Sequence, residues 1–451
     1  MDLGRLGWRS ILGIATFAML FQQAFSYACQ MVMPVLADRL AEDFGISRGW
    51  LGLYLFVQNF VAILAAVGCG GFILRYGPMR VSQIVLFLMA GSILVVSTGV
   101  LWLYPLAAIL LGLSAVSTPA SSHILARVCP PRLAPLIFSV KQTGVPVGSL
   151  IGGLLLPFLL GLVIYSATLG TTIRVGTYGT AFAMAVIVML VAVALQPIRA
   201  YFDSERRPET KLSFGDMPQT MRLVLGEPAL RDLSFAAFAF GGLQSLFAGF
   251  FILYLIDGLS FSETEAGSAY AIASFSAIFA RIAWGILGGT IVSPRIILGA
   301  IGFFGGIASL LVTQFDASWG LFEITLVAIL FNTTAISWHG ILLAETARLS
   351  PADKVGTITG GVLAFTSIAM MCYPAVYGIL LATSGSYRTG FIFAAIPSLL
   401  AFVIFMRRPI EGGWVNTITY VCSRGLTLRG AGITMLVALS GLVIGYLSYS
   451  R

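Results

Sequence analysis

Apolar stretches of about 18 or more residues, the length that marks a membrane helix, recur along this sequence from one end to the other. Lipid offers no water to the backbone N–H and C=O groups, so such stretches are expected to be α-helical. Of the 451 residues, 58% are hydrophobic and 10% are charged, whereas a soluble domain has about 25% charged residues. The sequence therefore predicts an all-α polytopic membrane protein.

The apolar stretches form two sets of six. The first stretch is too long, and is followed by too many others, to be a cleaved signal peptide. We place the membrane helices near residues 11–36, 49–74, 80–100, 103–125, 135–161, 178–197, 229–256, 263–289, 295–314, 318–342, 356–383 and 388–406. Between the two sets, residues 198–227 are polar and of mixed charge, which is typical of a linker with room for a short surface helix.

Basic residues gather at one end of these helices. With a cytoplasmic N-terminus, most of the 26 Lys and Arg residues fall at the cytoplasmic side. Those on the opposite side are Arg39, Arg48, Arg174 and Arg388. The asymmetry follows the positive-inside rule. The net charge of +8 is therefore explained by topology, and we expect no nucleic-acid partner.

Residues 138–157 are apolar but carry Lys141 well inside the helix. Gly144, Gly148 and Gly152 recur every four residues, which puts them on one face where another backbone can approach closely. Lys141 falls within roughly 60° of this face, so it points at protein or a cavity. An intramembrane ionisable group is a functional-site hypothesis. The alternative is a lysine that snorkels to the cytoplasmic surface.

The first and fourth helices each carry one polar stripe. The stripe of the first helix consists of Gln22, Ser26 and Gln30, and that of the fourth consists of Ser114, Thr118 and Ser122, with His123 and Arg127 at the cytoplasmic end. A stripe of this kind faces a neighbouring helix or a wet cavity. Substrate contact and simple helix–helix hydrogen bonding both remain open.

The second half supplies Gln244, Arg281, Asn332 and His339 within its helices. Arg281 shares its face with small residues, so it too is expected to point at protein. Asn332 and His339 are seven residues apart and are expected on one face. The alternative for His339 is a hydrogen-bonded structural role. Glu345, at the cytoplasmic end of the same helix, is expected to be solvated or to pair at a gate.

Residues 70–80 read GGFILRYGPMR. This segment resembles the loop-2/3 signature of the major facilitator superfamily, which it matches at Gly70, Arg75, Gly77 and Arg80. Leu74 stands where that family has an acidic residue. By its composition alone, the segment is a tight Gly-Pro turn with two cytoplasmic arginines.

The two halves of the chain resemble each other. Residues 59–71 align without gaps on residues 274–286, and residues 125–135 resemble residues 343–353. Many transporter folds are built from such repeats, with the substrate site at the midplane. The resemblance implies a twelve-helix fold of two pseudo-symmetric bundles, an alternating-access cycle and a bacterial inner-membrane location.

We therefore expect an N-terminal bundle over residues 1–197, a cytoplasmic linker over 198–227 and a C-terminal bundle over 228–410. Residues 411–451 form an extension, in which residues 433–449 are apolar. We expect this last run to cross the membrane a thirteenth time. A helix lying on the surface is the alternative.

No Asp or Glu lies in the middle of a predicted helix, so Lys141 and Arg281 have no carboxylate at their own depth in the sequence pattern. An anionic ligand can supply the missing countercharge, and arginine offers a bidentate fork to a carboxylate. Superfamily members that carry nitrate, oxalate or monocarboxylates use a cation on the eighth helix, a position that Arg281 resembles. We expect a secondary transporter for a small organic anion. A multidrug efflux pump and a transporter-like membrane sensor are the alternatives.

The expected substrate-binding set combines the buried polar and basic side chains: Arg281, Lys141, Gln22, Gln244, Asn332, His339, Ser26 and Thr118. The expected gating set is Gly70, Arg75, Gly77, Arg80, Arg127 and Glu345. If a proton is coupled, His339 is its expected carrier, because its unperturbed pKa is about 6.5.

The sequence lacks a nucleophile–base constellation, a phosphate loop and metal-ligand spacing. An enzyme, a cofactor and a metal site are therefore not expected. The five cysteines are scattered, and we interpret them as lone thiols. The expected partners are a small-molecule substrate, protons where transport is proton-coupled, and membrane lipid. The protein is expected to be a monomer.

Overall fold

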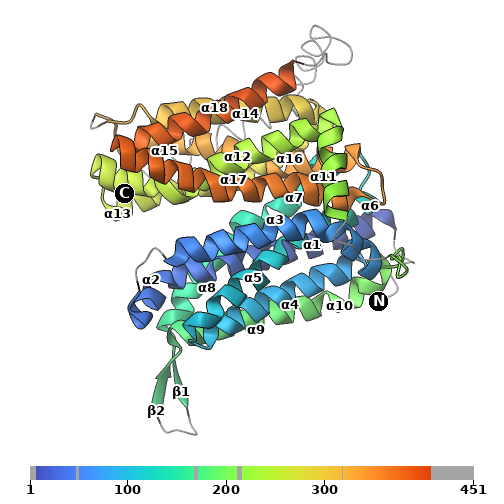
Figure 1. The fold of residues 1–451 in the computed structure, drawn as a ribbon, viewed down its shortest axis with the longest axis horizontal. Helices are drawn as coiled ribbons and strands as arrows, with labels where there is room; N and C mark the ends of the chain where they lie inside the picture. The colour runs from blue at the N-terminus through green and yellow to red at the C-terminus, as the bar shows by residue number, and fades with distance from the viewer. Residues whose placement is uncertain (1–6, 47–49, 167–170, 211–215, 317, 408–451) are drawn as a thin grey trace. The chain divides into compact units, whose positions relative to one another are not determined.

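The computed structural model describes residues 7–46, 50–166, 171–210, 216–316 and 318–407 (Figure 1). Within them, twelve helices are long and apolar enough to cross a membrane. They coincide with the twelve predicted segments, so the fold prediction is confirmed. The apolar run 433–449 lies outside the described residues.

The first six spans are built from α1 and α2, then α3, α4, a fourth span of several pieces, α7 with α8, and α9. Their bounds are α1 Trp8–Gln30, α2 Val32–Phe44, α3 Trp50–Tyr76, α4 Pro78–Ser97, η2 Leu101–Leu103, α5 Tyr104–Leu113, η3 Ser114–Val116, α6 Ser117–Val128, α7 Ala134–Gln142, α8 Gly144–Gly161 and α9 Gly176–Ala194.

The second six spans begin with α12 and end with α18. Their bounds are α12 Pro228–Leu253, η4 Tyr254–Gly258, α13 Glu263–Thr290, α14 Pro294–Val312, α15 Leu321–Phe331, η5 Asn332–Ile336, α16 His339–Leu349, α17 Val355–Ser384 and α18 Tyr387–Met406. The elements η4 and η5 are π-helical turns.

Three spans of the first half are interrupted three to five residues before a proline. Proline has no N–H to donate to the carbonyl four residues earlier, so the helix ladder breaks there. Pro34 follows the interruption at Met31, Pro146 follows that at Thr143, and Pro119 follows the 3-10 turn η3. The predicted fourth and fifth spans are present, and each is divided into shorter helical pieces.

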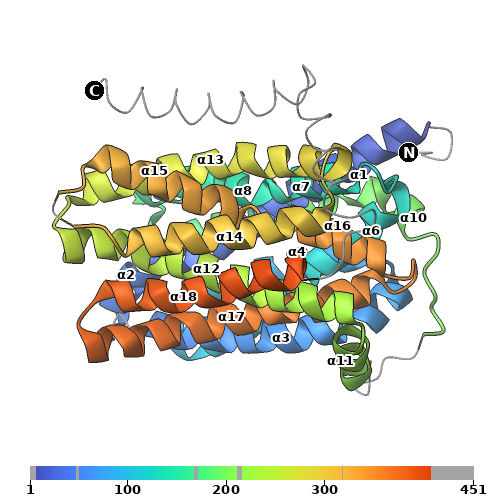
Figure 2. The same cartoon turned by 90° about the horizontal axis from the view of Figure 1, so that it is seen from above.

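Three elements outside the spans complete the described chain. The strands β1 (Val163–Ser166) and β2 (Thr171–Arg174) pair as an antiparallel hairpin that extends away from the helices (Figure 1). The linker region carries the short helices α10 (Gln196–Phe202) and α11 (Asp216–Gly226). Helix α11 lies crosswise to α3 in both views (Figures 1 and 2). Its Met217 packs against Ala66 and Val67 of α3.

The chain divides into two compact units. Unit 1 comprises residues 1–128, 141–223 and 350–364, and in it α1 packs on α8 and α4 packs on α9. Unit 2 comprises residues 129–140, 224–349 and 365 onward, and in it α14 packs on α18 and α13 on α15. The core of unit 2 is aromatic, with the ring centroids of Phe247 and Phe331 4.8 Å apart. The bundle boundaries given above remain a prediction.

Candidate substrate and gate sites

Lys141 is buried in unit 1, with 1% of its surface exposed. Its Nζ donates a 2.7 Å hydrogen bond to Oε1 of Gln23 on α1. The lysine therefore does not snorkel to the surface. Because an ammonium group can only donate, this bond also fixes the Gln23 amide: its oxygen faces the lysine and its N–H groups point elsewhere.

The glycine face of α8 is the reason that α1 can come so close. A Cβ added at Gly144 would lie 2.8 Å from the backbone oxygen of Leu20, and one added at Gly148 would overlap the backbone oxygen of Ala24. At Gly152 an added Cβ would lie 3.0 Å from Cβ of Met31. The predicted close approach of another backbone is confirmed, and that backbone is α1.

The polar stripe of α1 also meets the fourth span. Gln22 is fully buried and its Nε2 donates to Oγ of Ser117 at 2.9 Å. Ser26 is 1% exposed, and its hydroxyl has no hydrogen-bond partner within the described part of the chain. Thr118 is half-buried beside Ser117. In unit 1, Gln22 thus contributes to helix–helix bonding, while the Ser26 hydroxyl is available to a ligand.

Arg281 of α13 is buried in unit 2, with 1% of its surface exposed. Its Nη2 donates a 2.8 Å hydrogen bond to the backbone oxygen of Ile336, the last residue of the π-helical turn η5. One helical turn along α13, Trp284 donates its indole N–H to the oxygen of Thr333 at 2.7 Å. Both side chains satisfy carbonyl groups at the place where the tenth span departs from α-helical geometry.

The break in the tenth span corrects one prediction. Asn332 opens η5, the helix stops at Ser337 and Trp338, and His339 starts α16. The rule that residues seven apart share a face requires a continuous α-helix, so the argument that placed Asn332 and His339 on one face is wrong. π-Helical turns of this kind occur frequently at functional sites.

Two amides of unit 2 retain open acceptor atoms. Asn332 is fully buried, and its Nδ2 donates to the oxygen of Ala328 at 3.2 Å, which leaves Oδ1 buried without a partner among the described residues. Oε1 of Gln244 is also buried without a described partner. The indole N–H of Trp338, a residue not predicted from the sequence, is a buried donor without a hydrogen-bond partner among the described residues. His339 is half-buried and stacks on Trp338, with ring centroids 3.6 Å apart.

The loop segment 70–80 forms the tight turn between α3 and α4. Gly77 has φ +92°, a conformation that favours glycine, and Pro78 begins α4. Arg75 donates to the oxygen of Thr210 at 3.2 Å, whereas Arg80 is exposed. At the end of α6, Arg127 contacts the oxygen of Phe202.

The two glycines that the repeat alignment pairs make equivalent contacts. Gly70 aligns with Gly285, and continuing the second alignment in register pairs Thr357 with Ser139. In unit 1, a Cβ added at Gly70 would overlap the side chain of Thr357. In unit 2, a Cβ added at Gly285 would lie 2.7 Å from Cβ of Ser139. Each unit thus packs a glycine of one span against a hydroxyl residue at the start of another.

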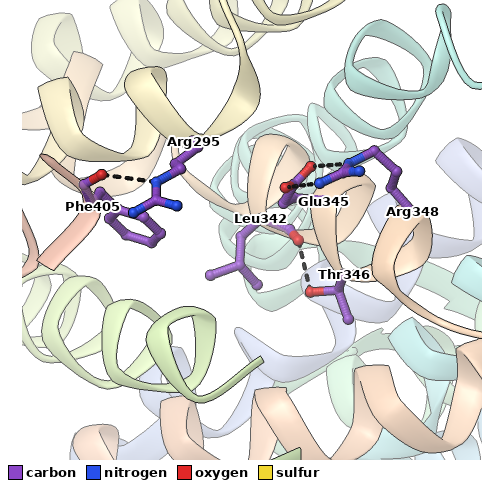
Figure 3. A network of polar contacts seen from close by, with 6 residues as sticks. All are labelled: Arg295, Leu342, Glu345, Thr346, Arg348 and Phe405. Atoms are coloured by element: carbon purple, nitrogen blue, oxygen red, sulfur yellow. Dashed lines mark hydrogen bonds and ion pairs between the residues drawn. The ribbon is translucent and has the colours of Figure 1, made fainter. Parts of the chain in front are cut away.

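Glu345 pairs with a residue of its own helix (Figure 3). Arg348 donates to its two carboxylate oxygens at 2.8 Å and 2.7 Å, so Glu345 is buried but paired. Figure 3 also shows Arg295, whose Nε donates to the oxygen of Phe405 at 2.8 Å. The i,i+3 pair of Glu345 and Arg348 stabilises its own helix end by about 0.2–0.5 kcal/mol.

The sequence of this chain matches one protein-family model. The family model described as the Major Facilitator Superfamily matches residues 12–360. The chain belongs to the major facilitator superfamily. It is therefore a multi-pass integral membrane protein and a secondary transporter of small solutes. No curated protein matches the chain in sequence.

Solved transporters of the superfamily share the fold at low identity. A bacterial homologue of the iron transporter ferroportin, in an outward-facing state, has a TM-score of 0.70 at 15% identity over 89% of this chain and 99% of its own. The proton:xylose symporter XylE, bound to 6-bromo-6-deoxy-D-glucose, has a TM-score of 0.67 at 14% identity over 89% and 96%. The human organic anion transporter MFSD10 (TETRAN) has a TM-score of 0.66 at 16% identity over 89% and 100%. These likenesses show the superfamily fold.

The superfamily signature and the structure together identify residues that the sequence analysis did not select. Gln23 is the acceptor of Lys141, and Trp284 joins Arg281 at the break in the tenth span. Asp203 contacts the signature loop. Their partners lie 118, 49 and 124 residues away along the chain. No local spacing rule could have connected them.

Proposed function

We propose that this superfamily member carries a small organic anion, a carboxylate, across the membrane. The observation that carries the proposal is the pair of buried cations. Lys141 and Arg281 are each 1% exposed inside membrane spans. A cation at the centre of a membrane helix costs about 2.5–3.5 kcal/mol on insertion scales, so a countercharge from the substrate would be strongly favourable.

Each cation has a neutral acceptor. Lys141 donates to an amide oxygen and Arg281 to a backbone oxygen. The acidic residues within the described spans lie near the span ends. Asp232, Glu323 and Glu345 are examples. A neutral acceptor satisfies a donor but does not neutralise its charge, so a carboxylate would add a countercharge that these two hydrogen bonds do not supply. The organic anion transporter named above shares only its fold with this chain, so the substrate class rests on the cations.

We propose that Lys141 in unit 1 and Arg281 in unit 2 each bind carboxylate oxygens, and that the other polar residues of each unit orient the substrate by hydrogen bonds. These are Gln22, Ser26 and Thr118 in unit 1, and Gln244, Asn332 and His339 in unit 2. In a proton-coupled cycle, His339 carries the proton, because histidine titrates near physiological pH. Gly70, Arg75, Gly77, Arg80, Arg127 and Glu345 are the proposed gating set.

Uptake into proteoliposomes tests the anion proposal. Purified protein would be assayed with labelled acetate, lactate, succinate and benzoate, and with tetraphenylphosphonium as a lipophilic cation. We expect at least one carboxylate to accumulate above protein-free liposomes and tetraphenylphosphonium to remain unaffected. Transport of the cation without any carboxylate would replace the anion proposal by multidrug efflux.

We further propose that the N-terminus is cytoplasmic in a bacterial inner membrane and that the protein acts as a monomer. Arg75, Arg80, Arg127 and Arg206 gather at one end of unit 1, as the positive-inside rule requires of the cytoplasmic end. Single cysteines at positions 75 and 206 should label from the cytoplasmic side. Labelling of the two positions from opposite sides would contradict this topology.

A further inference from the structure

The signature loop lacks its own acidic residue, yet a carboxylate is present at the turn. Asp203, which follows α10, accepts from the backbone N–H of Met79 at 2.8 Å and of Arg80 at 3.1 Å, through its two oxygens. These N–H groups belong to the first turn of the 20-residue helix α4, where no carbonyl of the helix can satisfy them. The carboxylate thus comes from the linker and not from position 74.

The Asp203 carboxylate fills the space beside Gly77 in the α3–α4 turn. Asp203 is 7% exposed. A Cβ added at Gly77 would overlap its carboxyl carbon. Burial raises the pKa of Asp203, while the two N–H donors act in the opposite direction. The N-terminal end of a helix favours a negative charge. Asp203 is therefore held in a fitted site.

The segment after Asp203 is bound to the same turn. The backbone N–H of Arg207 donates to the oxygen of Leu74 at 2.7 Å. Arg75 donates to the oxygen of Thr210, and Arg127 pairs with Glu205 at 2.6 Å. Residues 203–210 therefore form a strap across the α3–α4 turn.

The strap also reaches the turn that precedes α17. Arg207 lies 3.8 Å from a carboxylate oxygen of Asp353. Directly after that turn, α17 touches α3: Sγ of Cys69 donates to the oxygen of Gly356 at 3.6 Å, and a Cβ added at Gly360 would overlap the oxygen of Ala66. One segment thus contacts the end of α3 and the turn that leads into α17, within unit 1.

We propose that Asp203 is a positioning residue of the transport gate: it supplies the carboxylate that the signature loop lacks, and through the strap it holds the start of α17 against α3. The proposal rests on superfamily membership and is independent of the substrate class. It assigns to the linker the gating role of the superfamily's acidic residue at position 74, because Leu74 has no carboxylate.

Native cysteines report on this contact without any substrate. Cys69 is 1% exposed beneath the start of α17, and Cys29 of α1 is equally buried elsewhere in unit 1. The experiment measures the labelling rates of both thiols by N-ethylmaleimide in proteoliposomes, resolved by peptide mass spectrometry. We expect Asp203→Ala to label Cys69 at least fivefold faster than wild type, with Cys29 unchanged. Asp203→Asn, which keeps an acceptor for the α4 N-terminus, should stay within about twofold of wild type.

Two further variants keep the test decisive. Asp316→Ala removes an exposed acidic residue that accepts from a loop N–H outside the strap, and should leave both rates unchanged. Asp353→Ala breaks a solvent-exposed pair and should fold normally, with a smaller but selective rise at Cys69. Wild-type labelling of Cys69 in folded Asp203→Ala and Asp353→Ala proteins would overturn the proposal. An equal rise at Cys29 would also overturn it, because the effect would then be general loosening.

Discussion

The guanidinium group of Arg281 and the backbone oxygen of Ile336 form a 2.8 Å hydrogen bond at the point where the tenth span leaves its α-helical path. Ile336 is the last residue of a π-helical turn, and the carbonyl groups at the end of a helix have no donor within that helix. A neutral carbonyl satisfies one of the five N–H groups of arginine and leaves its charge in place. Arg281 therefore supports the broken helix, and in the proposed function the same side chain binds the anion.

Replacement of Arg281 separates these two contributions. Arg281→Lys keeps the charge but loses the planar fork, so carboxylate binding should weaken by on the order of 1.5–3 kcal/mol. Isothermal titration or scintillation proximity with a transported carboxylate measures this effect. Arg295→Lys is the matched control, because Arg295 also donates to a backbone oxygen at 2.8 Å. Unchanged binding in folded Arg281→Lys and Arg281→Gln proteins would contradict the role of Arg281 in anion binding.

Lys141 and Gln23 are expected to act as a coupled pair. Lys141→Gln removes the buried charge, and Gln23→Leu removes its 2.7 Å acceptor. Each should reduce carboxylate binding, and the double variant should differ from the sum of the two by roughly 0.5–3 kcal/mol, as contacting residues do. Lys354→Gln, at an exposed lysine, serves as control. Strictly additive losses would indicate that the two residues act separately.

The paired glycines should be sensitive to a single methyl group. Gly285→Ala would place Cβ 2.7 Å from Cβ of Ser139 and 2.9 Å from the oxygen of Pro135. Overpacking of this kind costs about 1–3 kcal/mol, so the melting temperature in detergent should fall. Gly267→Ala lies in the same helix with nothing within 4 Å of the added Cβ. It should be neutral or stabilising by about 0.5–1 kcal/mol through helix propensity. Equal melting temperatures for the two variants would show that the close contact is not limiting.

Much of this architecture can be predicted from sequence because it depends on short-range periodicity. The twelve spans follow from apolar length, and the glycine face of α8 follows from a four-residue spacing. The burial of Lys141 and Arg281 follows from the small residues that share their faces. Each of these features is fixed by residues within one helix.

The breaks and the partners were harder to predict. The interruption at Thr143 traces to Pro146, which a closer treatment of proline could have found. The π-turn at Asn332 has no proline, and its carbonyls are satisfied from α13, so packing decides it. The role of Asp203 depends on a contact 124 residues away. Pairing over such separations is set by the fold and leaves no local pattern in the sequence.

Asp203 should also give the protein a distinctive dependence of stability on pH. Burial raises its pKa above the ordinary value of 3.8. The folded state then holds a proton that the unfolded state has lost, so the contribution of Asp203 to stability is fully present below pH 3.8 and is lost as pH rises through the raised pKa. Melting temperatures of wild type and Asp203→Asn, measured between pH 4 and about 7, should show wild type losing stability relative to the variant as pH rises.

Asp316 provides a control of opposite sign. Hydrogen bonds from Ser318 hold the pKa of this exposed carboxyl below its ordinary value, so its contribution is present above that value and is lost as pH falls through the lowered pKa. Relative to Asp316→Asn, wild type should therefore lose stability toward low pH. A difference between wild type and Asp203→Asn that does not vary with pH would contradict the raised pKa. In that case the carboxylate would be stabilised by the α4 N-terminus as fully as it is by water, and Asp203 would hold the turn without any cost of burial.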